Sequence, residues 1–375
     1  MSLQFNPEML VLARESRGKT QSELARMLAI SQGLLSRIEA GITDVSDDLL
    51  KKVVIALGYP PNFFYQTDQV YGYGSKCIYH RKRQSLNVSA LRQLFAEINI
   101  IRIQVSRLLT GADVEVENRF YRMDIEDYHS PENVAQILRR YWGIQSGPIE
   151  NLILAIESAG GIVVPCYFGT SKLDALSQWP QGSLPLFFVN SESPTDRMRF
   201  TLAHELGHVV MHQIPSADME SEADRFAAEF LMPAHDIKPE LRPTTLARLA
   251  VLKGYWRVSM AALLKRAGDL KVISERQRQS LWTQMSKEGY KKIEPLPIEE
   301  EKPTVLTDIL DVYRHSHGYT LAEMSALVAS YEHEFRVRFL PAPSPVTHSL
   351  RVVDGLARVD TAGTVASDEK AFKTL

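Results

Sequence analysis

The sequence predicts a mainly helical protein of the α+β class, and three observations carry this prediction. Apolar residues recur at helical spacing through most of the chain, while only two short runs, residues 160–165 and 186–190, have a strand pattern. At about 150 residues per domain, the 375 residues allow two or three domains with ample core. We expect a five-helix domain over residues 1–68, a basic helical connector over 69–125, a helical domain with a small β-sheet over 126–295, and a linker, small helical unit and tail over 296–375.

Composition and termini restrict the class of protein. With 45% hydrophobic residues, 23% charged residues and a net charge of -2, the chain has an ordinary globular composition. No apolar run reaches the roughly 18 residues of a membrane span, and no basic region with an apolar core follows Met1, so neither a span nor a signal peptide is expected. Two cysteines, Cys77 and Cys166, cannot form a disulfide framework. These observations favour a cytoplasmic protein without a membrane partner.

The first element is a set of five short helices expected over residues 9–64. Thr20 and Ser31 precede helices expected over residues 21–28 and 32–40, where their hydroxyls can accept hydrogen bonds from free backbone N–H groups. Only three residues separate these two helices. This is the spacing of a helix-turn-helix unit, whose second helix lies in the DNA major groove.

The stretch from Thr20 to Gly41, TQSELARMLAISQGLLSRIEAG, resembles the lambda-repressor/Cro (XRE) family. The resemblance implies a double-stranded DNA partner. It also implies that Gln21 contacts a phosphate and that Arg14 and Glu39 form an internal ion pair. Base edges would be contacted by four residues of the third helix: Gln32, Gly33, Ser36 and Arg37.

The charge of this unit raises a question about its affinity for DNA. Residues 1–65 contain seven Lys/Arg and seven Asp/Glu, so they lack the excess positive charge that provides non-specific affinity. The basic run from Lys76 to Arg83 could add phosphate contacts, or it could be a solvated connector. A homodimer would also increase affinity. The apolar stripe of a helix expected over residues 86–109 could form its seam, although packing on the following domain is the stronger expectation.

Two helices are expected within residues 131–159, and a polar, glycine-containing loop is expected between the two strands. After the strands comes the strongest chemical pattern of the chain, His204-Glu205-Leu-Gly-His208. Residues four apart project from the same face of a helix, so His204 and His208 can bind one metal ion with Glu205 beside it. The surrounding apolar residues would bury this helix, and buried histidines need partners. Gly207 is costly inside a helix and fits a place where another element approaches closely.

Two histidines are insufficient, because catalytic zinc sites use three protein ligands and a water. A second helix carries Glu220 and Asp224 one turn apart, and we expect Glu220 to be the third ligand. Asp224 would accept a hydrogen bond from a ligand histidine and fix its tautomer. Glu222 is expected to point away, about 200° round the helix from Glu220. His212, about 12 Å along the helix axis from His204, is expected to be a polar residue at the helix end.

Residues 197–208 (RMRFTLAHELGH) and 220–233 (ESEADRFAAEFLMP) resemble the ImmA/IrrE family of zinc metallo-endopeptidases. With residues 142–149, 186–190 and 246–259, the resemblance covers about half of the chain. That family cleaves repressor proteins in bacteria and their phages. The resemblance therefore implies a bacterial protein with a zincin-like peptidase domain and a repressor-like or antitoxin-like protein substrate. A strand beside the motif helix would be placed to pair with an extended substrate.

The remaining chain carries weaker signals. Amphipathic helices are expected over residues 246–255 and 260–270, and residues 294–303 have the composition of a linker. A small helical unit is expected from two helical stretches, residues 305–313 and 321–335, and the sequence assigns no role to the tail that begins at residue 341.

These features predict a DNA-binding transcriptional regulator fused to a zinc endopeptidase that cleaves a repressor, an antitoxin-type protein or itself. Zinc bound by His204, His208 and Glu220 would activate a water, and Glu205 would take its proton and pass it to the leaving amine. Two alternatives stay open. The peptidase-like domain could sense a ligand or metal without cleaving, although the intact Glu205 argues against this. The helix-turn-helix could instead dock a protein, which would fit its even charge.

Overall fold

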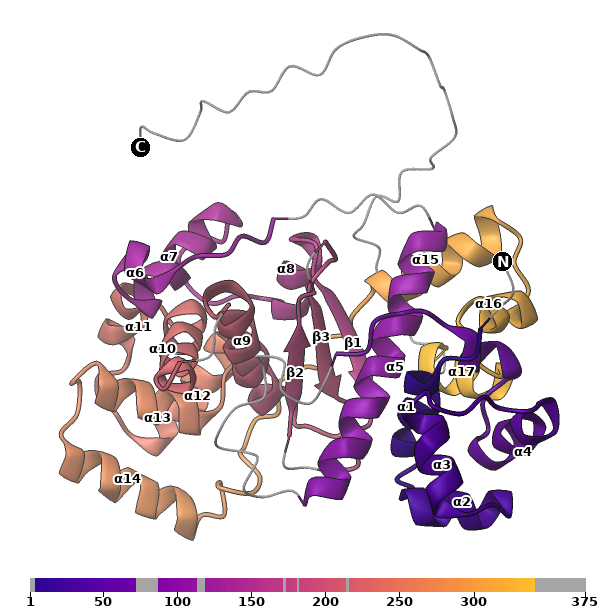
Figure 1. Ribbon diagram of the computed structural model, residues 1–375. Coiled ribbons are helices and arrows are strands. Elements are labelled where there is room, and N and C mark those ends of the chain that lie inside the picture. The colour runs from indigo at the N-terminus through magenta and orange to yellow at the C-terminus, as the bar shows by residue number, and fades with distance from the viewer. Residues whose placement is uncertain are drawn as a thin grey trace, which may run out of the picture.

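The computed structural model describes residues 4–71, 87–112, 119–170, 173–180, 182–213 and 216–340. Over these residues the chain is mainly helical with one small sheet, so the expected fold class is confirmed (Figure 1). The strands are β1 (Ile162–Cys166), β2 (Ala175–Gln178) and β3 (Leu186–Asn190). The helices are α1 (Pro7–Ser16), α2 (Gln21–Leu28), α3 (Gln32–Glu39), α4 (Asp47–Leu57), the 3₁₀ helix η1 (Pro61–Tyr65), α5 (Val88–Ala112), α6 (Ile125–Tyr128), α7 (Pro131–Tyr141), α8 (Leu152–Ser158), α9 (Thr195–Met211), α10 (Met219–Leu231), α11 (Ala234–Glu240), α12 (Leu246–Trp256), α13 (Met260–Asp269), α14 (Glu275–Lys287), α15 (Val305–Asp311), the π-helix η3 (Val312–Ser316), α16 (Leu321–Leu327) and α17 (Glu332–Phe339).

The N-terminal domain consists of α1 to α4 and η1, which replaces the fifth α-helix expected there. Both expected caps are present. The Thr20 hydroxyl accepts from the backbone N–H of Glu23, whose carboxylate accepts from the backbone N–H of Thr20, and the Ser31 hydroxyl accepts from Leu34. Ala29, in the left-handed region with φ 55°, turns the chain between α2 and α3. Local signals alone therefore determine where these two helices begin.

Helix α5 lies between the N-terminal domain and the sheet, and it is buried on two faces (Figure 1). Ala96, Ile100 and Ile103 pack with the core of the N-terminal domain. Residues of its other face, among them Ile98 and Val105, pack with the sheet and with the C-terminal helices. The apolar stripe that could have formed a dimer seam is thus used inside the chain, as the stronger of the two expectations had it.

The sheet has the strand order β1-β3-β2, with β1 parallel and β2 antiparallel to the central β3. Successive side chains of a strand point to opposite faces. Val163 and Phe187 accordingly join the hydrophobic cluster that contains α9, while Val164 and Phe188 join the cluster that contains α5. Both expected strands are present, but β2 was expected to be part of a polar loop.

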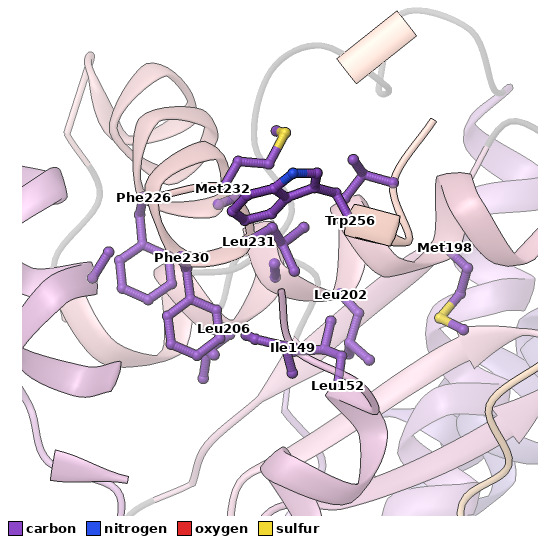
Figure 2. Close-up of a cluster of buried hydrophobic side chains, with 14 of the residues drawn as sticks. Ile149, Leu152, Met198, Leu202, Leu206, Phe226, Phe230, Leu231, Met232 and Trp256 are labelled. Carbon is purple, nitrogen blue, oxygen red and sulfur yellow. The ribbon is translucent and has the colours of Figure 1, made fainter. Parts of the chain in front are cut away.

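Helices α9 and α10 pack against each other through apolar side chains. Figure 2 shows Leu202 and Leu206 of α9 with Phe226 and Phe230 of α10 in one buried cluster. A Cβ atom on Gly207 would lie 3.0 Å from the Phe226 ring and 3.4 Å from the Ala223 Cα. The glycine is therefore where the expectation had it, at a close approach between two helices.

Residues 294–303 form no helix or strand and half of them are exposed, but two glutamates anchor this segment to the rest of the protein. Glu294 accepts hydrogen bonds from Lys253 and from the backbone of Met260. Glu301 is buried, where it pairs with Arg199 of α9 and accepts from the first turn of α8. The acidic, proline-containing composition that suggested a linker also supplies partners to buried cations and free N–H groups.

The C-terminal helices contact both α5 and the N-terminal domain (Figure 1). Glu334 of α17 pairs with Arg17 at 2.5 Å, and Arg338 pairs with Glu97 of α5 at 3.1 Å. The helical pattern expected over residues 321–335 is interrupted at Ala329, which has a left-handed φ of 49°. The small helical unit therefore joins the N-terminal domain to α5.

Three predictions fall outside the described residues. They are the role of the basic run from Lys76 to Arg83, the environment of Cys77 and the tail from residue 341. Among the described helices, none is both long and apolar enough to cross a bilayer.

Candidate functional site

The expected metal cluster is assembled from α9 and the first turn of α10. His204 and His208 stand one turn apart on α9, and Glu220 reaches them from α10. The His208 side chain is 3% exposed, whereas that of Glu220 is 28% exposed. The cluster thus has one buried side and one side open to solvent. Among the described residues, these three form the one group of His, Cys, Asp or Glu whose ligand atoms lie close enough to hold a metal ion.

The ligand atoms have the separations of a tetrahedral site. The Nε2 atoms of His204 and His208 are 3.0 Å apart. One Glu220 carboxylate oxygen lies 3.6 Å from Nε2 of His204, and the other oxygen lies 3.4 Å from Nε2 of His208. Zinc bonds of about 2.0–2.1 Å at tetrahedral angles place ligand atoms about 3.3 Å apart. The separations of the three residues are therefore compatible with one zinc ion.

The outer ring atoms of the two histidines are already engaged. Nδ1 of His204 lies 2.9 Å from the Asp224 carboxylate, and Nδ1 of His208 lies 2.9 Å from Nδ1 of His212. If both Nδ1 atoms carry hydrogens, both Nε2 atoms present lone pairs to the same point, which is the arrangement that two histidine ligands of one metal ion require.

Electrostatics also favours positive charge at this point. Burial lowers the pKa of His204, but hydrogen bonds to Asp224 and Glu220 outweigh burial and raise the pKa to about 9. Burial raises the pKa of Glu220, but hydrogen bonds with His204 and His208 outweigh burial and lower the pKa to about 2. The carboxylate is thus ionised at neutral pH, which is the form that binds a metal.

Glu205 lies next to the cluster on α9 and does not belong to the group of three. Its carboxylate is buried and accepts a hydrogen bond of 2.7 Å from the Ser177 hydroxyl of β2. The strand that was expected to be a loop therefore holds this carboxylate in place. No sequence signal pointed to Ser177, because its role depends on strand pairing.

The structure corrects two expectations about the neighbouring polar residues. Glu222 does not point away, because its carboxylate lies 3.1 Å from Nε2 of His212. His212 is at the helix end as expected, but it is buried and contacts His208. Burial lowers the pKa of His212 to about 3, helped by the nearby His208 and His204. The four-residue spacing from His208 to His212, which places both side chains on one face of the helix, is the sequence signal for this contact.

Lys265 of α13 also escaped the sequence prediction. Its ammonium lies 2.9 Å from the second oxygen of Asp224, whose first oxygen contacts His204. Burial raises the pKa of Asp224, but the hydrogen bond with His204 and the contact with Lys265 outweigh it, so the pKa is lowered. Asp224 therefore stays ionised and can accept a hydrogen bond from Nδ1 of His204.

In the N-terminal domain, hydrogen bonds connect a buried ion pair to the first residues of α2 and α3. Arg14 and Glu39 form the expected pair, with two bonds of 2.7 and 3.0 Å. The Gln21 amide donates to Glu39 at 2.7 Å, and the Gln32 amide donates to the Gln21 oxygen at 3.0 Å. The two glutamines that were expected to contact phosphate and base edges are thus held side by side.

The remaining residues expected at the DNA lie on one helix surface. Gln32, Gly33 and Arg37 are exposed, and Ser36 is half-buried. A Cβ atom on Gly33 would meet nothing within 4 Å, so this position leaves room for an approaching surface.

Comparisons with known families agree with both parts of the chain. Residues 157–267 match the peptidase M78 family model, described as an IrrE N-terminal-like domain, and residues 10–64 match a helix-turn-helix family model. The fusion expected from the two resemblances is confirmed at this level. The chain matches no curated protein.

Proposed function

We propose that this chain is a transcriptional regulator that binds operator DNA through α3 and cleaves a protein through a zinc site formed by His204, His208 and Glu220. The substrate class we assign is a repressor or antitoxin-type protein, with the chain itself as a further substrate. The observation that supports this most is the convergence of His204, His208 and Glu220, whose ligand atoms all lie within 4.8 Å of one another, with Glu205 following His204 on α9. The cytoplasm, where such DNA and repressors lie, is the compartment we assign.

Zinc, when bound, would lower the pKa of a bound water towards 7 and polarise the scissile carbonyl. The residues of the chain do the rest. Glu205 takes the proton of the attacking water on its carboxylate and delivers it to the leaving amine. Ser177 donates to one carboxylate oxygen, which fixes the orientation of the other towards the reacting atoms. Burial of Glu205 keeps bulk water from competing for the proton.

The edge position of β2 supports an extended peptide as the substrate. In the described sheet, β2 pairs on one side with β3, and it carries Ser177 next to Glu205. A peptide that pairs with the free side of β2 would run past the metal cluster with its backbone fixed by main-chain hydrogen bonds.

A second candidate function is a regulator whose peptidase-like domain binds a metal or ligand without cleaving. The packing of α5 favours this alternative, because one of its faces contacts the N-terminal domain and the other contacts the sheet beside α9. A change at the metal cluster could thus reach the DNA-reading domain through one helix.

A comparison of new protein N-termini in cells that express wild type or Glu205→Gln tests the proposal. We expect a small set of cleavage products that appear with wild type only, drawn from repressors, antitoxins or this chain. Equal sets in both strains, with both proteins present at the same level and loaded with zinc, would rule out the peptidase and leave the sensor.

Selection of binding sites from random DNA by the full chain tests the other half. We expect a defined sequence motif, and its loss in Arg37→Ala. If wild type selects no motif, the helix-turn-helix docks a protein instead.

A further inference from the structure

Three hydrogen-bonded side chains, His208, His212 and Glu222, connect the buried histidine of the metal cluster to α10. Nδ1 of His208 lies 2.9 Å from Nδ1 of His212, and Nε2 of His212 lies 3.1 Å from the Glu222 carboxylate. His208 and His212 are both buried, while the Glu222 side chain is 22% exposed. These hydrogen bonds therefore run from the interior to the solvent-accessible side of α10.

The chemistry of the carboxylate decides where the hydrogens are. An ionised carboxylate only accepts, so Nε2 of His212 must donate to Glu222. A neutral His212 then has a lone pair on Nδ1, which accepts from Nδ1 of His208. Nε2 of His208 is left with a lone pair directed at His204 and Glu220. Each hydrogen bond thus follows from the one before it.

We propose that Glu222 and His212 form a positioning relay that keeps His208 in its metal-binding tautomer and ring orientation. Asp224 does the same for His204 in one step, through a direct contact of 2.9 Å. The inference rests on the metal-binding part of the proposed function and does not require cleavage. Neither Glu222 nor His212 is a ligand, because neither belongs to the group whose atoms converge on one point.

The place of His212 at the end of α9 explains why the relay has two steps. His212 follows the last residue of the helix and adopts an extended backbone, with φ -104° and ψ 96°. Its ring lies between α9 and α10, so it bridges a distance from His208 that the Glu222 side chain does not cover in this structure. Three carboxylates of α10 thereby have separate partners: Glu220 faces both ligand histidines, Asp224 contacts His204 and Glu222 contacts His212.

Zinc affinity of the full chain, measured by competition with a chromophoric chelator, tests the relay. His212→Leu fills the space but cannot accept or donate, and we expect zinc affinity to fall about 10- to 100-fold, as for other residues that orient a ligand histidine. His212→Gln should recover most of this loss, because the amide can accept from His208 with its oxygen and donate to Glu222 with its nitrogen. A His212 that only fills the core would give the opposite order, since leucine packs better than glutamine.

Glu222 provides a second pair of variants on a partly exposed side chain, where folding is not at risk. Glu222→Ala should weaken zinc binding about 10-fold, and Glu222→Gln should bind close to wild type because it retains the acceptor oxygen. His235→Ala, which removes an exposed histidine of α11 in the same domain, is the matched control and should bind zinc as wild type does.

The ring nitrogens of ¹⁵N-histidine-labelled, zinc-loaded protein give an independent readout. We expect His208 to carry its hydrogen on Nδ1 in wild type and in Glu222→Gln, and the His212 tautomers to mix in Glu222→Ala. The relay is wrong if His212→Leu or Glu222→Ala binds zinc within twofold of wild type. If His212→Leu does not fold, the two Glu222 variants decide. Wild type that binds zinc tightly but cleaves nothing would overturn the proposed peptidase and leave the relay standing.

Discussion

In the N-terminal domain, a series of hydrogen-bonded side chains begins inside the protein and ends at its surface. At the metal cluster, two such series begin at partly exposed carboxylates and end at histidines that lie deeper. In the N-terminal domain, the charged pair Arg14 and Glu39 is buried and the amide of Gln32 is exposed. At the metal cluster, the carboxylates of Asp224 and Glu222 are partly exposed, with 27% and 22% of their side chains accessible, and the histidines they hold lie deeper.

In each region, the direction of the hydrogen-bond series fits the partner that we propose for that site. A DNA groove is a large external partner, so the reading groups must be outside and their support inside. A metal ion and an attacked carbonyl require a site from which bulk water is excluded, so the working atoms are inside. Removing a supporting carboxylate should therefore lower the folding stability of the N-terminal domain, whereas at the metal cluster it should lower metal affinity. Four predictions test this difference.

The largest effect is expected for Glu39→Ala. The change removes the carboxylate that contacts the buried Arg14 guanidinium at 2.7 Å and leaves it the more distant carboxylate of Glu15, at 3.8 Å. Breaking a buried pair by removing one partner costs about 3–5 kcal/mol. Hydrogen exchange of the α2 and α3 amides in the full chain should show local stability reduced by this amount. Asp48→Ala, which breaks an exposed pair with Lys51, serves as control and should change stability by less than about 1 kcal/mol. Similar small effects of both variants would remove the distinction between the two regions.

Glu205→Gln should reduce cleavage at least 100-fold, the usual minimum contribution of a positioned general base. Zinc affinity should not change, because Glu205 is outside the group of ligands. The amide can still accept the Ser177 hydrogen bond, so the fold around β2 should also be unchanged. Rates with the identified substrate and metal content of the same preparation provide the measurement, and retained cleavage at full zinc occupancy would assign the base to another residue.

Asp224→Ala should weaken zinc binding about 10- to 100-fold and leave stability nearly unchanged. The reason is that the vacated position is partly exposed, so water can solvate both His204 and the half-exposed Lys265. Chelator competition and thermal unfolding of the zinc-free protein measure the two quantities, with Asp127→Ala on the surface of α6 as control. A large loss of stability in the zinc-free state would mean that this support is structural, like Glu39.

Arg37→Ala has the smallest expected effect. Arg37 is exposed in the last turn of α3. A bidentate contact between an arginine and guanine contributes about 1–3 kcal/mol of discrimination. Folding should be unaffected, and binding to preferred and random DNA should become more nearly equal. Titrations of both DNAs at several salt concentrations measure this. An equal loss of affinity for both would indicate a phosphate contact rather than base recognition.

Short-range sequence patterns predicted helices α2 and α3 and the candidate metal ligands. Thr20 and Ser31 cap helices through bonds within three residues, so the boundaries of α2 and α3 were predictable from local sequence. His204 and His208 lie on one face of α9 because of the helical repeat, and Glu220 follows one helix later. The domain families of both regions are confirmed, whereas the roles of individual residues remain predictions.

Tertiary structure alone decided the supports of these sites. Ser177 reaches Glu205 because β2 pairs with β3, and β2 has no strand pattern of its own strong enough to predict it. The angle around α10 predicts that Glu222 faces away from Glu220, but that angle does not specify which side chain of a neighbouring element lies there. His212 meets it there because α9 ends at Met211 and the chain leaves in an extended conformation.

The sequence by itself therefore determined which residues can bind a metal and which helices can read DNA, because both depend on spacings of three to five residues along one helix. Only the tertiary structure decided what holds those residues in place. Glu301 pairs with Arg199, and Glu334 with Arg17, across long stretches of chain. Such pairs form where packing brings buried or half-buried charges together. A charge that has lost its water must be paired, but no local sequence pattern specifies its partner.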